Sequence, residues 1–179
     1  MTDLSDAEMM NRIQSADAAA FRELLNRFER KVFGLAWRLT ASEADARDLT
    51  QDVFLKVWKN PAAWQPTAKL DTWLYRVAYN AFIDMRRREK PTEELGETLE
   101  SPAASPEKAM LLQNEADRVR KAVDSLPARQ KEALILCYYQ DLKAKDAAQI
   151  LGLSQGATEA LLFRARQSLK DLLGKEIMT

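Results

Sequence analysis

The sequence predicts an all-α protein: two small helical domains joined by a flexible acidic linker, the second domain containing a helix-turn-helix. Apolar residues recur at three- and four-residue spacing through most of the 179 residues, which is the helical period. No stretch of useful length alternates polar and apolar residues as a strand does. A segment rich in proline and glutamate separates two helical blocks. We place the domains at residues 1–90 and 109–179, with the linker at 91–108.

The first block begins with two predicted helices. Asp17 is suited to cap a helix whose apolar positions fall at helical spacing over residues 21–39. Ser42 is suited to cap the next helix, and Asp45 three positions on makes the pattern close to a capping box. Asn60 and Pro61 end that helix, because proline disfavours helix in the residue before it.

A loop and a third helix complete the first block. The loop runs from Pro61 to Lys69 and contains tryptophan and a second proline. The helix starts near Asp71 or Thr72 and runs into the basic cluster at residues 86–88.

The linker is recognised by its composition and charge. Residues 91–106 hold three prolines, one glycine and four glutamates. Residues 1–90 carry 15 basic and 13 acidic side chains, and residues 111–179 carry 11 and nine, so two mildly basic blocks flank an acidic segment. With 27 charges of each sign, the chain lacks the basic excess of a simple DNA-binding protein. DNA affinity would have to come from local patches or from a partner.

The second block predicts a helix-turn-helix near its end. Its helices begin near Glu107, and Pro127 suits the first turn of a helix that continues to about residue 139. A short helix ends at Gly152, which suits a left-handed turn position, and Ser154 can cap the last helix. Two helices joined in this way form a helix-turn-helix pattern. Many helical hairpins look similar, so a hairpin that packs on itself is the alternative.

The composition excludes much catalytic chemistry. The chain has no histidine, which removes Ser–His and Cys–His nucleophilic pairs and histidine zinc sites. Cys137 is the single cysteine and lies in an apolar run, so we predict that it packs in a core, with redox sensing as the alternative. We expect no enzyme, no metal site and no cofactor.

The sequence also predicts a protein that does not enter a membrane. The first six residues are mostly polar or acidic, unlike a signal peptide. No stretch approaches the roughly 18 consecutive apolar residues of a membrane span. We therefore expect a cytoplasmic protein.

One helix face in the first block mixes polar side chains with a leucine. Asp48, Gln51, Asp52 and Leu55 recur at three- and four-residue steps and so share a face. A solvated face rarely needs the leucine, whereas a protein interface uses one as an anchor. Both interpretations remain open on this pattern alone.

The third predicted helix interleaves aromatic and basic residues over positions 70–88. Aromatic rings stack on unpaired bases and arginines neutralise phosphates, so the pattern is typical of single-strand binding. The alternative is that Trp73 and Phe82 lie in the core while the arginines form a solvated helix end.

The last helix carries the candidates for base recognition. In a helix-turn-helix the N-terminal residues of the second helix meet base edges in the major groove. Gln155, Thr158 and Glu159 stand there, and glutamine can bind adenine while glutamate can accept from cytosine. Arg164 and Arg166 follow.

These motifs, in this order on either side of a linker, resemble the sigma factors of bacterial RNA polymerase. The resemblance covers residues 17–173 and is greatest to the small extracytoplasmic-function group, which keeps only the second and fourth sigma domains. It lies in three segments: Asp48-Leu49-Thr50-Gln51-Asp52-Val53-Phe54, then Trp73-Leu74 with Ala78, Asn80 and Asp84, and finally Leu126-Pro127-Ala128-Arg129-Gln130 with Arg164-Ala165-Arg166.

The resemblance implies a factor that binds core RNA polymerase and directs promoter-specific initiation under the control of an anti-sigma factor. Its first domain (1–90) would bind polymerase and read and melt the minus-ten element, and its second (109–179) would read the minus-thirty-five element. The polymerase-binding residues would be Asp48, Gln51, Asp52, Phe54 and Leu55. The DNA-binding residues would be Trp64, Lys69, Trp73, Tyr75, Arg76, Asn80, Asp84, Arg86, Arg87, Arg88, Ser154, Gln155, Thr158, Glu159, Arg164 and Arg166.

The sequence departs from the family pattern at several positions. Leu70 stands where phenylalanine is common, and Lys143 and Ala144 replace a serine and an aromatic residue. Glu159 and Leu161 replace a lysine and an arginine at the start of the last helix. Phosphate contacts there should be fewer, so either the minus-thirty-five element is unusual or its contact is weak. Leu161 could instead pack on the other domain or on a regulator.

Two other classes of protein fit parts of the pattern. A stand-alone helix-turn-helix regulator would bind a palindrome as a dimer without polymerase, but the chain has no obvious dimerisation helix. A helical adaptor that has lost DNA binding would explain Glu159 and Leu161.

Overall fold

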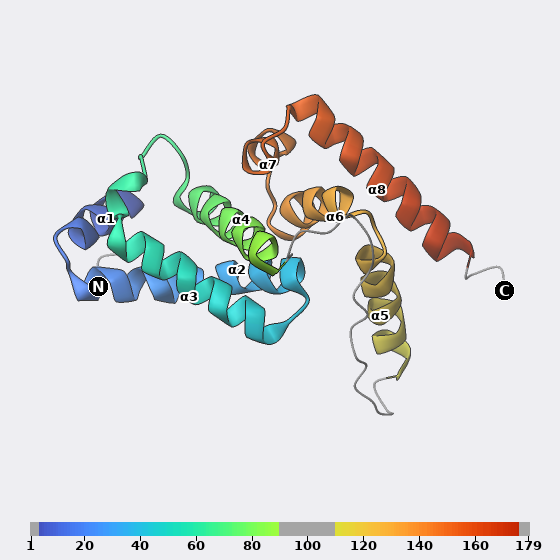
Figure 1. The fold of residues 1–179 in the computed structure, drawn as a ribbon, viewed down its shortest axis with the longest axis horizontal. Coiled ribbons are helices and arrows are strands. Elements are labelled where there is room, and N and C mark those ends of the chain that lie inside the picture. The colour runs from blue at the N-terminus through green and yellow to red at the C-terminus, as the bar shows by residue number, and fades with distance from the viewer. Residues whose placement is uncertain (1–3, 90–109, 176–179) are drawn as a thin grey trace. The chain divides into compact units, whose positions relative to one another are not determined.

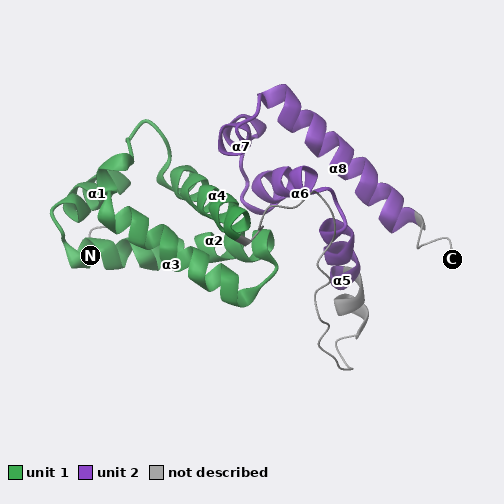
Figure 2. Cartoon of the chain, viewed as in Figure 1, with its two compact units in different colours: residues 1–92 green, residues 93–179 purple. Residues whose placement is uncertain are grey.

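In the computed structural model, the described residues are 4–89 and 110–175, and every regular element among them is helical. The prediction of an all-α fold is confirmed. The chain divides into two compact units, Met1–Thr92 and Glu93–Thr179 (Figure 2). The predicted linker, residues 91–108, lies outside the described residues.

Unit 1 is built on the three helices that the sequence predicts, together with two elements that it does not. Its elements are α1 (Asp6–Gln14), α2 (Ala18–Thr40), α3 (Glu43–Lys59), the 3₁₀ turn η1 (Pro61–Ala63) and α4 (Leu70–Glu89) (Figure 1). The predicted caps are present, because the side chains of Asp17 and Ser42 accept hydrogen bonds from backbone N–H groups in the first turns of α2 and α3. Helix α4 starts at Leu70, slightly before its expected start.

The core of unit 1 lies where α2, α3 and α4 pack on one another. Burying a leucine or valine side chain contributes on the order of 2 kcal/mol, so this core fixes the helices firmly. Fully buried members are Leu24, Val32 and Leu35 on α2, Val53 and Val57 on α3, and Leu70 and Leu74 on α4.

Sequence reasoning missed helix α1. It begins with a capping box, in which the Ser5 hydroxyl accepts from the Glu8 N–H and the Glu8 carboxylate accepts from the Ser5 N–H. The helix buries Met9, Met10 and Ile13. The pattern of a serine followed by a glutamate three residues later was available as a signal.

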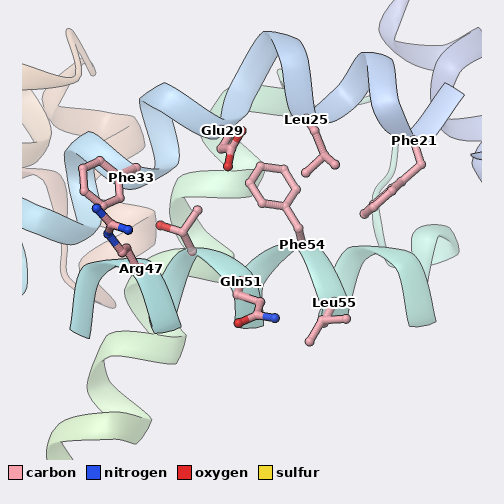
Figure 3. Close-up of a pocket in the computed structure, with 9 residues that line it drawn as sticks. Phe21, Leu25, Glu29, Phe33, Arg47, Gln51, Phe54 and Leu55 are labelled. Atoms are coloured by element: carbon pink, nitrogen blue, oxygen red, sulfur yellow. The ribbon is translucent and has the colours of Figure 1, made fainter. Parts of the chain in front are cut away.

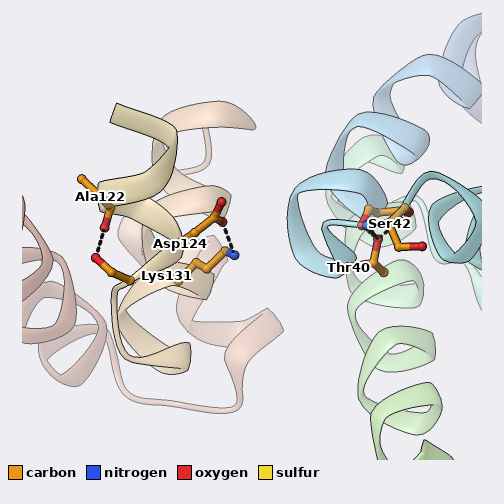
Figure 4. Close-up of polar contacts among 7 residues, drawn as sticks. Thr40, Ser42, Ala122, Asp124 and Lys131 are labelled. Carbon is orange, nitrogen blue, oxygen red and sulfur yellow. Dashed lines mark hydrogen bonds and ion pairs between the residues drawn. The ribbon is translucent and has the colours of Figure 1, made fainter. Parts of the chain in front are cut away.

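The turn between α2 and α3 is closed by two neighbouring hydroxyl side chains (Figure 4). The Thr40 hydroxyl donates to the carbonyl of Ala36 at 2.9 Å and accepts from the Ser42 N–H at 3.3 Å. Ala41 between them adopts a left-handed conformation with φ 56°. The turn therefore ends one helix and starts the next within two residues.

Unit 2 contains the predicted helix-turn-helix. Its elements are α5 (Met110–Asp124), α6 (Ala128–Leu134), the π-helical turn η2 (Ile135–Tyr139), α7 (Ala144–Leu151) and α8 (Gln155–Lys175). Gly152 ends α7 with φ 66°, and the Ser154 hydroxyl accepts a hydrogen bond from the N–H of Ala157. One cluster of its core consists of Val123, Leu126, Leu134 and Ala165, against which Leu169 packs.

The joint from α5 to α6 is held by local polar contacts (Figure 4). The Ser125 hydroxyl donates to the carbonyl of Ala122 at 2.8 Å, and the Lys131 ammonium pairs with Asp124 at 2.6 Å. Beyond α6 the chain widens into η2 instead of continuing as the regular helix that the sequence predicts. The wide turn leaves Tyr138 and Tyr139 exposed.

Candidate functional site

The outer face of α3 carries the four side chains that the sequence groups together. Asp48, Gln51, Asp52 and Leu55 are all exposed, and Leu55 is 45% exposed despite being apolar. The opposite side of the helix is buried through Leu49, Val53 and Val57. A helix fixed on one side thus presents an acidic face with an apolar anchor to solvent.

An apolar groove of about 400 Å³ lies beside this face, between α2 and α3 (Figure 3). Phe54, predicted to bind a partner, is largely buried, and its ring projects from α3 toward α2 (Figure 3). Gln51 and Leu55 line both the groove and the outer face of α3. The complete lining is Phe21, Leu25, Glu29, Phe33, Arg47, Thr50, Gln51, Phe54 and Leu55.

The groove is a feature that sequence reasoning missed. The sequence assigns Phe21 and Leu25 to one apolar stripe with Leu24 and Phe28, but only the latter two are buried. Phe21, Leu25, Glu29 and Phe33 form a second row at four-residue spacing, apolar except for Glu29. Phe21 also meets the Trp58 ring edge-on at 4.8 Å between centroids. The apolar face of α2 is wider than the part that packs in the core, so the rest of it faces solvent or a partner.

The loop between α3 and α4 is closed by its own tryptophan. Trp64 is 7% exposed, and its indole Nε1–H donates to the carbonyl of Ala68 at 3.2 Å. The sequence predicts that Trp64 contacts DNA, whereas here its ring shapes the loop. Lys69, predicted at the same site, is exposed at the loop's end.

Helix α4 presents a polar stripe. Arg76, Asn80 and Asp84 are exposed at four-residue intervals, and Arg87 and Arg88 follow. The other predicted residues of this helix are less open. Trp73 is half-buried, Tyr75 is buried, and the Arg86 guanidinium lies 5.5 Å from the centre of the Phe82 ring.

The first turn of α8 separates exposed candidates from a buried one. Ser154 and Gln155 are exposed, but Thr158 is 0% exposed and its hydroxyl donates to the carbonyl of Ser154 at 3.1 Å. Thr158, which the sequence predicts to contact DNA, is therefore buried here, and its hydroxyl stabilises the start of α8.

Gln155 and Glu159 act as a pair on the exposed side of α8. The Gln155 Nε2–H donates to Glu159 Oε1 at 2.8 Å. The first basic residue of the helix is Arg164, and the Arg166 guanidinium lies 5.9 Å from the centre of the Tyr138 ring. The start of α8 thus presents an amide and a carboxylate, with positive charge only in later turns.

Two apolar residues of α8 have different environments. Leu161, for which the sequence allows packing on another surface, is already half-buried. Phe163, which sequence reasoning did not single out, is 60% exposed. It follows Glu159 by four residues and so lies on the same side of the helix.

The single cysteine lies in unit 2 and its thiol is not in a reactive environment. Cys137 is half-buried, and burial raises the pKa of its thiol although the nearby positive charge of Arg166 opposes the shift. A raised pKa lowers the thiolate fraction, which favours the packing interpretation over redox sensing. Within residues 4–89 and 110–175, no helix is both long enough and apolar enough to cross a membrane.

Comparison with known families gives two matches along the chain. Sigma-70 region 2 matches residues 24–92, and Sigma-70, region 4 matches residues 116–169. The first match covers the loop, α4 and all of the groove lining except Phe21. The second covers the helix-turn-helix.

Individual relatives agree with these matches. The ECF RNA polymerase sigma factor SigM of Mycobacterium tuberculosis is 31% identical over 172 residues, 95% of this chain and 85% of that protein. SigE of Mycolicibacterium smegmatis is 33% identical, but this chain spans 61% of its length. The solved sigma factor RpoE, in complex with the anti-sigma factor NepR from Bartonella quintana, is 26% identical with a TM-score of 0.66, covering 86% of this chain and 96% of that one.

Proposed function

This chain belongs to the extracytoplasmic-function (ECF) family of RNA polymerase sigma factors, and from that premise we propose how its residues serve promoter-specific initiation. Unit 1 binds core polymerase and the melted minus-ten element, and unit 2 binds the minus-thirty-five element. The factor supplies binding free energy and no catalytic step. Because the bacterial chromosome lies in the cytoplasm, the chain works there.

The outer face of α3 is the observation that carries this proposal. Asp48, Asp52 and Gln51 would contact the coiled coil of the polymerase clamp, with Leu55 as the apolar anchor. Leu55 is an exposed leucine on a rigid helix, with polar side chains on one side and the apolar groove on the other, which is the composition of an interface hot spot. The acidic charge of this face is suited to a protein partner and would repel DNA phosphates.

The loop and α4 would act on the promoter strand. A base extruded from the non-template strand would enter the loop at residues 60–69, where Lys69 is exposed. Arg76 and Asn80 would contact the strand, and Arg87 and Arg88 would bind phosphates further along. Extrusion costs a few kcal/mol of lost stacking, which capture of the base offsets. Trp64 holds the loop in shape for this step.

Helix α8 would read the minus-thirty-five element through Gln155 and Glu159. The hydrogen bond between them orients both side chains and leaves Glu159 Oε2 to accept from a cytosine amino group. Phe163, one turn later, is placed to meet a thymine methyl group. Without cations in its first turns, α8 would bind DNA weakly by itself, so attachment to polymerase supplies the remaining affinity.

The groove between α2 and α3 would receive an anti-sigma factor. Its apolar walls, interrupted by Glu29, Arg47 and Gln51, suit an amphipathic helix whose apolar side chains enter at four-residue spacing. The solved complex of RpoE with NepR supports regulation of this kind. Because Gln51 and Leu55 belong to both surfaces, a helix seated in the groove would compete with polymerase.

The test is co-purification of the purified chain with bacterial core RNA polymerase, followed by run-off transcription on genomic fragments. A stable complex that produces new promoter-dependent transcripts is the expected result. A folded chain that is free of any inhibitor and does not bind polymerase would overturn the proposal. Binding to a palindromic DNA site without polymerase would instead indicate a stand-alone regulator.

A further inference from the structure

Helix α1 has no role in the function proposed above. It lies outside the region 2 match, which starts at residue 24. It is nevertheless deeply packed, since Met9, Met10 and Ile13 are 0%, 1% and 2% exposed. It packs on α2 and on the short turn η1, which lies alongside α1 in Figure 1.

Two polar connections hold α1 in one position relative to α2. The Arg12 guanidinium pairs with Asp17, the cap of α2, at 2.6 Å. The Arg27 guanidinium donates to the carbonyl of Leu4 at 2.7 Å, next to the capping box of α1. The hydrogen bond from Arg12 lowers the pKa of Asp17, so this connection is complete at neutral pH and is lost only as the pH falls through that lowered value.

The turn η1, in contrast, has little to hold it. None of its three residues is buried, and no side chain caps it at Asn60. Its backbone makes two hydrogen bonds, from the N–H groups of Ala63 and Trp64 at 3.2 and 3.3 Å. A turn with so few internal contacts takes its position from the helices that touch it, which are α1 and α3.

We propose that α1 is a positioning element for promoter melting: by packing on η1, it fixes the loop at residues 60–69 in the geometry that receives the extruded base. Misplacing reacting or binding groups by about 1 Å costs large factors in rate, so a loop without this support would capture the base poorly. Polymerase binding on the outer face of α3 would not depend on α1. The inference rests on the proposed role of the loop.

The first test measures the loop itself, in the free protein. Ile13→Ala removes buried contacts of α1, and Val32→Ala is the matched control, since it removes a fully buried side chain from α2. We expect Ile13→Ala to accelerate hydrogen exchange at the N–H groups of Ala63, Trp64 and Ala68 by about tenfold more than at the amides of α2 and α4. Equal acceleration throughout unit 1 in both variants would overturn the inference.

A milder pair of variants covers the case in which Ile13→Ala does not fold. Ser5→Ala removes the cap of α1, and Ser5→Asp keeps an acceptor there. We expect selective exchange of the loop amides in Ser5→Ala and wild-type exchange in Ser5→Asp. If Ser5→Ala leaves the loop amides protected while α1 itself exchanges, α1 does not position the loop.

The second test measures promoter opening by the holoenzyme with permanganate footprinting. On duplex DNA we expect Ile13→Ala to open about fivefold less promoter than Val32→Ala, with polymerase affinity within about twofold of wild type. On a template already unpaired across the minus-ten element, the two variants should transcribe equally. A deficit of the same size on both templates would contradict a positioning role.

A loop variant separates this inference from the function on which it rests. Lys69→Ala should also reduce opening of duplex DNA. If it opens the promoter normally, the proposed role of the loop fails, whereas the exchange experiment still decides whether α1 positions residues 60–69. If Lys69→Ala is defective and Ile13→Ala matches Val32→Ala in both tests, the inference about α1 fails alone.

Discussion

The two units start their functional helices with the same kind of turn but close it with different residues. In unit 1, α2 ends at the left-handed Ala41, and Ser42 immediately caps α3. In unit 2, α7 ends at the left-handed Gly152, one residue intervenes, and Ser154 caps α8. Glycine takes this conformation without steric cost, whereas alanine does not.

The helices that follow these turns differ in what they offer a partner. Helix α3 exposes an acidic face with Leu55 and an adjoining groove, which suits a protein. Helix α8 exposes Gln155, Glu159 and Phe163, which suits base edges. The comparison teaches that the connection before a helix sets only the direction of that helix. The side chains in its later helical turns determine what the helix binds.

The largest expected effect is a loss of polymerase affinity on changing α3 but not on changing α8. Leu55→Asp places a charge at the proposed anchor, and we expect polymerase affinity to fall by at least about tenfold, the scale of an interface hot spot. Glu159→Ala should change it by less than about twofold. Competition binding with labelled core polymerase measures both variants, and equal losses would contradict the assignment of α3 to polymerase.

Charge reversal at Glu159 tests whether the lack of cations in the first turns of α8 limits its affinity for DNA. Glu159→Lys should strengthen binding of the holoenzyme to DNA that lacks the minus-thirty-five element by roughly fivefold at low salt and steepen the logarithmic salt dependence by about one, while the preference for the element falls because the acceptor for cytosine is lost. Glu43→Lys, an exposed acidic residue in the first turn of α3, is the matched control and should change neither quantity. An unchanged salt dependence for Glu159→Lys would mean that α8 does not approach phosphates.

The two serine caps should be equivalent in stability even though their helices differ in function. Ser42→Ala and Ser154→Ala should each lower the free energy of unfolding of their own unit by about 1 kcal/mol, because each leaves a backbone N–H without its acceptor. Denaturant titration followed by hydrogen exchange assigns the loss to a unit. Replacement by aspartate should retain most of the stability, and a variant with no loss would show that its cap is redundant.

The smallest effects should have opposite signs at the two left-handed residues. Gly152→Ala should destabilise unit 2 by about 1 kcal/mol through backbone strain alone, since an added Cβ would meet no atom within 4 Å. Ala41→Gly should stabilise unit 1 by about 0.5 kcal/mol, because relief of strain exceeds the extra chain entropy that glycine loses. Thermal melts of both variants measure this, and shifts of the same sign would contradict the comparison.

The features predictable from sequence are those set by neighbouring residues. The caps at Asp17, Ser42 and Ser154 and the turn at Gly152 depend on hydrogen bonds and backbone angles within a few positions, and the structure confirms them. The capping box of α1 is equally local, and it was missed because only a few apolar residues follow it in a polar segment.

Other features depend on packing between helices, which spacing does not determine. Thr158 has the position of a base-reading residue, but its side of α8 faces the core. Trp64 has the chemistry of a stacking ring, but the loop folds around it. The groove exists because α2 and α3 leave part of the apolar arc of α2 uncovered. The partner contacts proposed for the exposed residues stay predictions.

The wide turn η2 has a consequence for how unit 2 tolerates insertions and deletions. Residues 135–139 wind more loosely than an α-helix, and a π-helical turn accommodates one extra residue relative to regular winding. Each residue of an α-helix rotates the chain by about 100°. Losing one residue here would return the segment to regular winding without that rotation, because the wide turn already holds the extra residue, so unit 2 can take a one-residue change in length at this segment without redirecting α8.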